Sequence, residues 1–311
     1  MVSALFLRII NKGRRKMREY VIITDSCSDL DKKKREEYNI EYVPMHYMYD
    51  GKEVVALLDW EELPPKDFYD IMRNGTRIFT SQVNALDYKE TFEKWINAGY
   101  DVLYISCSSA LSASIKSSLL VRDELLAKYP DAKIICVDSL CACMGLGLLT
   151  IRAAELREEG KTIEETAAWI EKNRNTMNQE CTVDSLQYLK QAGRVSAASA
   201  FFGGILNVKP IIISDAIGRN NAVEKVKGKK KAFSRIVERM KAQIEQVPYQ
   251  RVFISHADCI DAAEEMKELI LKALPNVEVE IGYIGPIIGA TVGPGTIGVY
   301  FYGKEVTYGK E

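Results

Sequence analysis

The sequence is poor in the residue that acid–base catalysis uses most. Its 311 positions include only two histidines, His46 and His256. It also lacks an excess of positive charge, because 42 lysine and arginine residues nearly balance 43 aspartate and glutamate residues. Nucleic-acid-binding proteins usually carry a basic excess, so we expect no nucleic acid partner. No uncharged apolar run approaches the ~20 residues that a membrane-spanning helix needs.

The motifs of several enzyme classes are also missing. The chain contains no G-x-S-x-G nucleophile elbow, and neither phosphate-binding pattern, G-x-x-x-x-G-K-[ST] or G-x-G-x-x-G, occurs. The late segment "GPGTIG" is a weak glycine loop, which we interpret as a hairpin turn. We expect His46 to be structural, whereas His256 ends a predicted strand and is a plausible site residue. The chemistry alone therefore indicates an anion-binding site without catalytic machinery.

The cysteine pattern does not indicate a disulfide framework. The chain has seven cysteines, an odd number, and most lie in apolar sequence. Structural disulfides need an oxidising compartment, and no secretory signal precedes them, so we expect reduced thiols and a cytoplasmic protein. Cys141 and Cys143 are close in sequence, but no second close pair of Cys or His completes a metal site. We therefore expect no metal and attribute this pair to packing.

Residues 1–16 differ from the rest of the chain. Their five basic residues largely follow an apolar stretch, which reverses the order of a signal peptide, and they include no acid. A strand-like segment, "REYVIITD", comes directly after Met17. We interpret residues 1–16 as a non-native or disordered extension and Met17 as the functional start.

Two regions with different patterns follow. In residues 17–160, apolar strands such as "EYVIITDS", "DVLYISCS" and "AKIICVDS" alternate with helices, which predicts an α/β domain with a mostly parallel sheet covered by helices. We interpret "IEYVPMHYMY" as one strand. Residues 161–311 are predicted to form an α+β domain, with a boundary near Gly160. There, Thr162 and Glu165 predict a capping box, Asp184 a helix N-cap, and residues 277–303 strands with glycine turns.

Hydroxyl and carboxyl side chains follow three of the predicted parallel strands. They are Thr24-Asp25-Ser26, Ser106–Ser109 and Asp138-Ser139. Ligands of open α/β sheets bind at the carboxyl ends of the strands, so we expect these segments to gather on one edge. Each segment alone is equally compatible with helix capping. A cluster of hydroxyls can bind a carboxylate, since a hydrogen bond to a charged acceptor contributes roughly 1.5–3 kcal/mol.

Several segments, taken in order, resemble a known family. They are "ITDSCSDL", "TSQV", "ISCSSALSAS", "LQYLKQAGRVS", "SHAD" and "GPIIGATVGPGTIGVYF". With these segments the chain resembles, from Tyr20 to about Gly303, the DegV family of fatty-acid-binding proteins, which includes the acyl-carrier subunits of bacterial fatty acid kinase. The resemblance implies two domains with a long-chain fatty acid in a buried tunnel near their interface. It further implies a non-enzymatic carrier, without a cofactor, that presents the fatty acid to a separate kinase for phosphorylation.

The resemblance also implies the residues of the site. The residues implied to hold the ligand carboxylate are Thr80, Ser81, Ser108, Ser109, Ser112, Ser114 and His256. Arg194 and His256 are implied in presenting that carboxylate to the kinase. The chain departs from the family pattern at four positions: Ala113 and Ala192 replace usual glycines, Ser114 replaces a usual threonine but keeps a hydroxyl, and Thr291 replaces a common histidine. These departures concern the head-group site more than the fold.

Other functions remain open at this stage. One alternative is a serine-dependent acyl hydrolase that uses Ser109 or Ser112 with His256. Another is a regulatory protein that responds to a bound lipid. Arg194 follows a predicted helix and is also compatible with a role at the helix dipole. The lysine cluster Lys225, Lys227, Lys229, Lys230 and Lys231 is compatible with a solvated face, an acidic kinase partner or transient membrane contact.

Overall fold

The computed structural model describes residues 18–195 and 208–310. The predicted extension, residues 1–16, lies outside this range. Within the described residues, no helix has the length and apolar character needed to cross a membrane.

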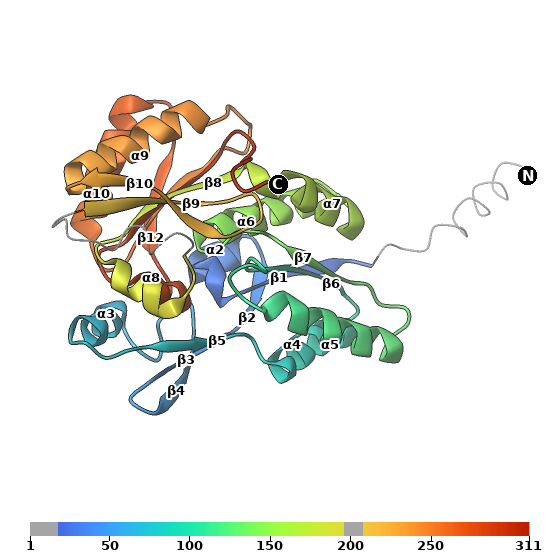
Figure 1. Ribbon diagram of the computed structural model, residues 1–311. Helices are drawn as coiled ribbons and strands as arrows, with labels where there is room; N and C mark the ends of the chain where they lie inside the picture. Colours follow the sequence, from blue (N-terminus) through green and yellow to red (C-terminus); the bar gives the residue numbers. More distant parts are fainter. Residues whose placement is uncertain (1–17, 196–207, 311) are drawn as a thin grey trace, which may run out of the picture.

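The first region forms the parallel sheet that the sequence predicts. Its strand order is β2-β1-β6-β7, and all neighbours are parallel. The strands are β1 (Tyr20–Asp25), β2 (Ile40–Val43), β6 (Asp101–Ser106) and β7 (Ile134–Asp138). Both faces are covered: α4 (Ala85–Asn97) and α5 (Ser114–Lys128) pack on one, and α6 (Met144–Glu158) and α7 (Ile163–Asn173) on the other (Figure 1). The predicted α/β architecture is therefore confirmed.

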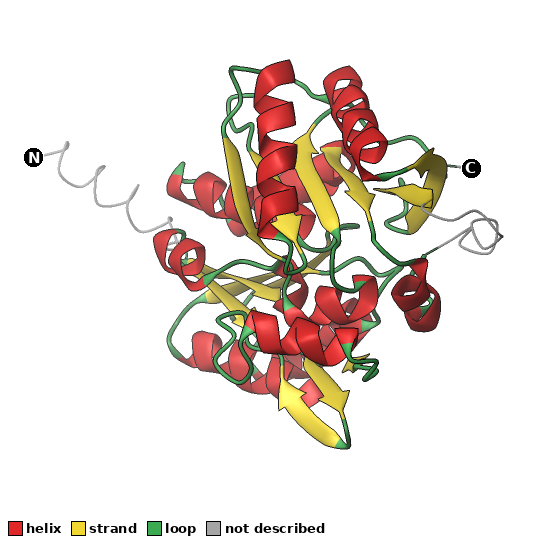
Figure 2. Cartoon of the chain, turned by 90° about the vertical axis from the view of Figure 1, so that its left-hand side faces the viewer, coloured by secondary structure: helices red, strands yellow, loops and turns green. Residues whose placement is uncertain are grey.

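The later region is a mixed sheet of six strands in the order β10-β9-β8-β13-β11-β12. Its strands are β8 (Met177–Thr182), β9 (Val208–Ser214), β10 (Asn220–Lys227), β11 (Val252–His256), β12 (Val279–Tyr283) and β13 (Ile297–Tyr302). Only β11 and β12 pair in parallel. Helices α9 (Lys229–Gln243) and α10 (Ile260–Ala273) cover one face and build an apolar cluster of their own (Figure 2). This combination of a largely antiparallel sheet with helices agrees with the predicted α+β class.

A third, small antiparallel sheet has the order β4-β3-β5. It consists of β3 (His46–Tyr49), β4 (Lys52–Val55) and β5 (Phe79–Ser81), with α2 (Lys32–Glu37) and α3 (Pro65–Arg73) nearby in sequence. The prediction of one strand over "IEYVPMHYMY" is wrong, because β2 ends at Val43 and β3 begins at His46. Pro44 lies at the break, where its missing N–H would leave a gap in the ladder of hydrogen bonds.

Three further predictions for the later region need correction. Residues 277–303 contain a helix, α11 (Pro286–Val292), between β12 and β13, and Pro286 occupies its first position. Proline is favoured there because a helix leaves that N–H unpaired. The segment "GPGTIG" therefore leads from a helix into a strand and does not turn a hairpin. Helix α8 (Leu186–Ala192) is capped by Ser185 in place of Asp184, while the capping box of Thr162 and Glu165 is confirmed.

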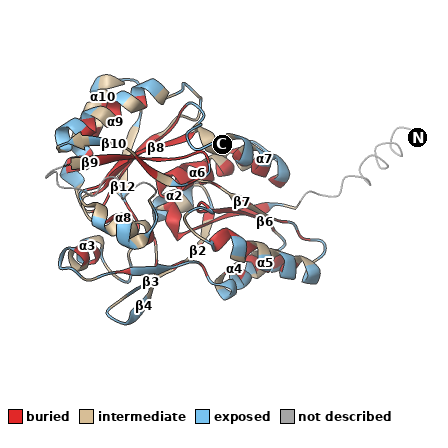
Figure 3. Cartoon of the chain, in the orientation of Figure 1, coloured by how far each residue is buried: buried red, intermediate tan, exposed pale blue. Residues whose placement is uncertain are grey.

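The two large sheets share helix α6. This helix contacts β1 and β6 on one side and β8 and β13 on the other. Most of its residues are buried, and it belongs to an apolar cluster that runs from β1 to Tyr300 and Tyr302 of β13 (Figure 3). The boundary near Gly160 stays a prediction.

The carboxyl ends of the parallel strands meet as expected, and Asp25 joins two of them. Its buried carboxylate accepts hydrogen bonds from the backbone N–H groups of Cys27 and Cys107 and from the Tyr104 hydroxyl, each at 2.9 Å. Burial raises the pKa of Asp25, while these three donors lower it. On the neighbouring strand, Asp138 accepts a hydrogen bond of 3.1 Å from the Ser109 N–H. The acids at the strand ends thus fix the loops that follow.

Asp25→Ala is expected to lower the free energy of unfolding by roughly 3–5 kcal/mol, because three buried donors lose their acceptor. The control is Asp31→Ala, which removes an exposed cap of α2 and should cost only about 1 kcal/mol. Urea denaturation of both variants measures the difference. Equal losses for the two substitutions would contradict this role of Asp25.

Candidate functional site

A cavity of about 200 Å³ lies where the strand ends of the parallel sheet face the six-stranded sheet. Much of its wall is apolar, formed by Met45, Leu111, Val183, Leu189, Ile212, Ile284, Ile287, Ile288 and Val292. Four thiols add to this wall: Cys27, Cys107, Cys143 and Cys181. The polar lining residues include Thr80, Ser81, Gln82, Ser112, Gln179, Arg194, Asn220, Thr291 and Thr296. The cavity therefore combines an apolar surface with a group of hydroxyls.

Four of the predicted site residues meet at this wall: Thr80, Ser81, Ser112 and Arg194. Thr80 and Ser81 lie on the exposed strand β5, and the Ser81 hydroxyl donates to the His46 carbonyl at 3.4 Å. Arg194 is exposed after the end of α8, and its Nε donates to the Leu111 carbonyl at 3.3 Å. These residues, far apart in the sequence, form one polar end of the cavity that is open to solvent.

Ser114 supports Ser112 from outside the cavity lining. Ser114 is buried, and the two hydroxyl oxygens lie 2.9 Å apart. The Ser114 N–H also donates to the Ser112 hydroxyl at 3.2 Å, while the Ser114 hydroxyl accepts from the Val83 N–H at 3.4 Å. Since the Ser112 oxygen can accept from both groups of Ser114, its own proton is available to an acceptor in the cavity.

Ser108 and Ser109 lie outside the lining. The buried Ser108 hydroxyl donates to the Gly218 carbonyl at 2.8 Å and accepts from the Ala110 N–H at 3.2 Å. It thereby ties its loop to the turn between β9 and β10. The exposed Ser109 has its N–H bonded to Asp138. Their role in carboxylate binding stays a prediction, and in this structure their contacts are those of loop anchors.

His256 is also outside the lining. It is buried at the end of β11, where its Nδ1 accepts a hydrogen bond of 3.2 Å from the Cys259 N–H. Its ring lies 4.4 Å from that of Tyr283, and burial lowers the pKa of the imidazole. Among the described residues, neither Ser109 nor Ser112 hydrogen-bonds to it. The arrangement that a serine hydrolase needs is therefore not formed in this structure.

Helix α11 supplies a wall that the sequence analysis missed. Its Ile287, Ile288 and Thr291 line the cavity. Gly289 is packed so closely that a Cβ there would lie 2.5 Å from the Tyr69 hydroxyl oxygen, and that hydroxyl donates to the Ile284 carbonyl at 2.7 Å. The glycines of "GPIIGATVG" recur every fourth residue, which places them on one face of a helix. That spacing was the signal available in the sequence.

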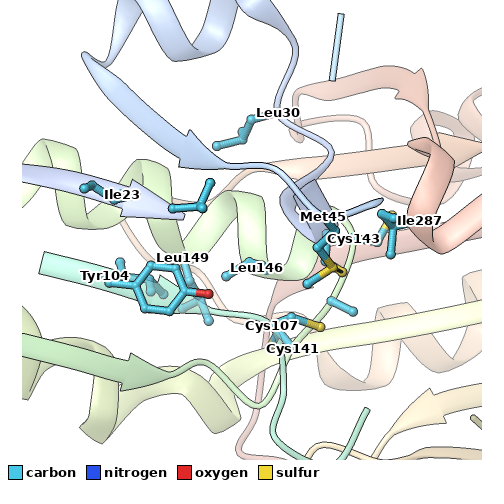
Figure 4. Close-up of a cluster of buried hydrophobic side chains, with 14 of the residues drawn as sticks. Ile23, Leu30, Met45, Tyr104, Cys107, Cys141, Cys143, Leu146, Leu149 and Ile287 are labelled. Carbon is cyan, nitrogen blue, oxygen red and sulfur yellow. Dashed lines mark hydrogen bonds between the residues drawn. The ribbon is translucent and has the colours of Figure 1, made fainter. Parts of the chain in front are cut away.

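The thiols are the second feature that sequence reasoning missed as part of the site. Figure 4 shows Cys107 and Cys143 within the buried cluster, with Met45 and Ile287 near Cys143. All seven cysteines are free, and burial raises the pKa of Cys141 and of Cys181. No group of three or more His, Cys, Asp or Glu in residues 18–195 and 208–310 is placed to hold a metal ion.

Asp29 is a half-buried acid behind the cavity wall, and both of its carboxylate oxygens are shielded from solvent. Its carboxylate faces the thiol of Cys143 and the N–H of Gly285, which precedes α11. Neither carboxylate oxygen has a hydrogen-bond partner at ordinary distance in the described part of the chain. Burial raises the pKa of Asp29 to about 7, against the lowering effect of Cys143 and Gly285.

Comparison with known proteins identifies the family. A family model described as an uncharacterised protein of the DegV family matches residues 19–304. A DegV domain-containing protein of Clostridium perfringens, CPE0026, is 40% identical over 287 residues, which cover 92% of this chain and 98% of that protein. A Streptococcus pyogenes relative, spyM18_2003, is 32% identical over 287 residues, 92% of this chain and 99% of that protein. The chain therefore belongs to the DegV family.

Solved structures share the fold. A DegV family protein from Thermus thermophilus, described by its fatty acid binding, has a TM-score of 0.81 and 29% identity, covering 92% of this chain and 100% of that one. DegV of Bacillus subtilis, described as a fatty acid binding protein, has a TM-score of 0.78 and 27% identity, with coverage of 92% and 100%. Structural neighbours of this chain thus bind fatty acids.

The raised pKa of Asp29 predicts a pH-dependent effect of Asp29→Asn. Between the unfolded value of 3.8 and the folded value of about 7, the native state holds a proton that the unfolded chain lacks. The contribution of Asp29 to stability therefore falls as the pH rises through this window. Relative to wild type, the variant is expected to be more stable at about pH 8 than at about pH 4, as measured by urea midpoints. An effect of equal size at both pH values would show that Asp29 does not titrate in this way.

Proposed function

We propose that this protein binds a long-chain fatty acid in the cavity, with the carboxylate at Thr80, Ser81, Ser112 and Arg194 and the acyl chain along the apolar wall. The observation that carries the proposal is the presence of both parts in one cavity: a polar end open to solvent and a buried apolar surface. The fatty acids bound by structural neighbours support the same ligand class.

The polar end suits a carboxylate. The Ser112 oxygen accepts from the Ser114 N–H, and it can also accept from the Ser114 hydroxyl, which leaves the Ser112 proton free to donate to a carboxylate. Each hydroxyl donor to a charged acceptor contributes roughly 1.5–3 kcal/mol, and the Arg194 guanidinium adds a positive charge beside them. Thr80 and Ser81 lie on β5, whereas Ser112 lies in the loop before α5, so donors to the carboxylate come from two separate segments.

The apolar wall suits an alkyl chain. Each methylene group transferred from water contributes roughly 0.8 kcal/mol, from which the entropy of immobilising the chain is subtracted. Aliphatic residues from β8, α8, β9 and α11 provide this surface. The thiols and Met45 add polarizable atoms that adapt to irregular chain shapes.

We further propose that the protein is a cytoplasmic, non-catalytic carrier that offers the carboxylate to a separate fatty acid kinase. Exposure of Thr80, Ser81 and Arg194 supports access from outside. The lysine cluster at the end of β10 and the start of α9 supports contact with an acidic partner surface or, transiently, an anionic membrane. Its lysines are exposed, and Lys229 pairs with Glu265 at 3.2 Å. A regulatory role for the lipid-bound form is compatible with the same site.

Ser112→Ala is expected to weaken fatty acid binding about 10- to 100-fold, because one hydrogen bond to the carboxylate is lost. Isothermal titration with palmitate measures the change. Ser109→Ala is the matched control, and it should leave the affinity unchanged because Ser109 lies outside the lining. A larger loss of affinity for Ser109→Ala than for Ser112→Ala would show that the carboxylate binds near Ser109, at the other end of this loop.

Ile288→Trp is expected to abolish palmitate binding, because the indole ring fills the cavity beside α11. The control is Ile217→Trp, at an exposed residue in the turn between β9 and β10. Titration and urea denaturation of both variants separate blocking from unfolding. Full affinity in a folded Ile288→Trp variant would place the acyl chain elsewhere.

A further inference from the structure

Cys143 holds an unusual position on the cavity wall. It is the N-cap of α6, a helix of 15 residues, and has φ 53° and ψ −147°. A non-glycine residue at positive φ is strained by about 1–3 kcal/mol, a cost usually met at functional positions. The positive end of the helix dipole favours negative charge that develops on its sulfur. Figure 4 shows Cys143 beside Met45 and Ile287, which also line the cavity.

Behind this thiol lies the buried carboxylate of Asp29. An unpaired acceptor in the interior is costly and therefore rare. Both carboxylate oxygens of Asp29 are shielded from solvent and have no close hydrogen-bond partner in the described chain, and the thiol of Cys143 faces them. The hydroxyls of Ser255 and Tyr300 also lie near the Cys143 thiol, and both lower its pKa. Cys143 therefore has a proton acceptor on one side and the cavity on the other.

The other cavity thiols lack this arrangement. The Cys27 thiol is 3.6 Å from the sulfur of Met45, and the Cys181 thiol lies 3.9 Å from the Thr182 carbonyl. Cys107 contacts Cys27, and the nearby Asp25 carboxylate is already occupied by three donors. Among the lining cysteines, Cys143 is the one that faces a carboxylate whose oxygens have no other close hydrogen-bond partner.

At rest, the Cys143 thiol is protonated. Burial, followed by the nearby charge of Asp29, raises its pKa well above the ordinary value. The Cys143 thiol is therefore unreactive toward reagents in solution. A reactive group held in the cavity is different, because proximity alone can raise the effective concentration of the partner by several orders of magnitude.

We propose that Cys143 captures electrophilic fatty acids covalently, namely lipids with an α,β-unsaturated carbonyl group within the acyl chain, and that Asp29 acts as its base. The proposal rests on the proposed fatty acid site, which would hold the chain against this thiol. Asp29 takes the thiol proton as the sulfur bonds to the β-carbon of the enone. The carbon–carbon π bond opens to an enolate, and the proton is returned to the α-carbon. The step is an addition, so no group leaves and no oxidant or reductant is consumed.

The test uses long-chain fatty acids with a trans enone near the head, the middle or the tail, and the matching saturated ketones. After incubation of the full-length protein, intact mass spectrometry should show one added enone molecule per chain for at least one position, and none for the ketones. Peptide mapping should place the adduct on Cys143. Cys143→Ser should lower the rate at least 10-fold, whereas Cys136→Ser, outside the cavity, should leave it unchanged.

The Asp29→Asn variant tests whether Asp29 acts as a base or only supports the structure around Cys143. It should slow adduct formation at saturating enone at least 10-fold while the affinity for the saturated ketone stays within about twofold of wild type. Equal labelling of all cavity cysteines, an unchanged rate in a folded Cys143→Ser or Asp29→Asn variant, or no adduct in protein that binds palmitate would overturn the inference. Failure to bind palmitate and the ketones would instead overturn the proposed fatty acid site on which it rests.

Discussion

The three hydrogen bonds to the Asp25 carboxylate are the constraint on which the site depends. They fix the turn after β1 and the loop after β6 to each other at the centre of the parallel sheet. The first of these segments brings Cys27 to the cavity, and the second brings Cys107, Leu111 and Ser112. Both oxygens of this buried acid accept hydrogen bonds from backbone or tyrosine donors. Asp25 thereby holds two irregular segments in one geometry, which the proposed carboxylate-binding loop requires.

The cavity wall that α11 forms is held in place by close packing, not by hydrogen bonds to a buried carboxylate. Glycines on one face of α11 let Tyr69 approach the helix backbone, and Tyr188 packs in the same way at Gly293. The other face of the helix is then free to present isoleucines to the cavity. Together with the shared helix α6, this arrangement produces an apolar space between two sheets and a polar opening at one end. One wall is thus set by hydrogen bonds and the other by packing.

The sequence predicts the parts of this architecture that local pattern controls. Apolar strands that alternate with amphipathic helices predict the parallel sheet, and the acids that end "VIITD" and "IICVD" mark the edge where the cavity lies. It does not predict helix α11, because glycine and proline in "GPIIGATVG" resemble turn residues when only composition is considered. It also does not show which serines face the cavity. Ser108 bonds to a carbonyl 110 positions away, and Ser114 turns inward behind Ser112. These choices arise from tertiary contacts, as does the lining role of the cysteines.

The most direct test of the carrier account is native mass spectrometry of the purified protein, followed by extraction and identification of any bound molecule. The account predicts an added mass that extracts as a long-chain fatty acid, with one molecule per chain. If the protein arrives without ligand, it should take up one equivalent of added fatty acid. A bare chain that also fails to take up fatty acids would contradict the account while leaving the fold intact.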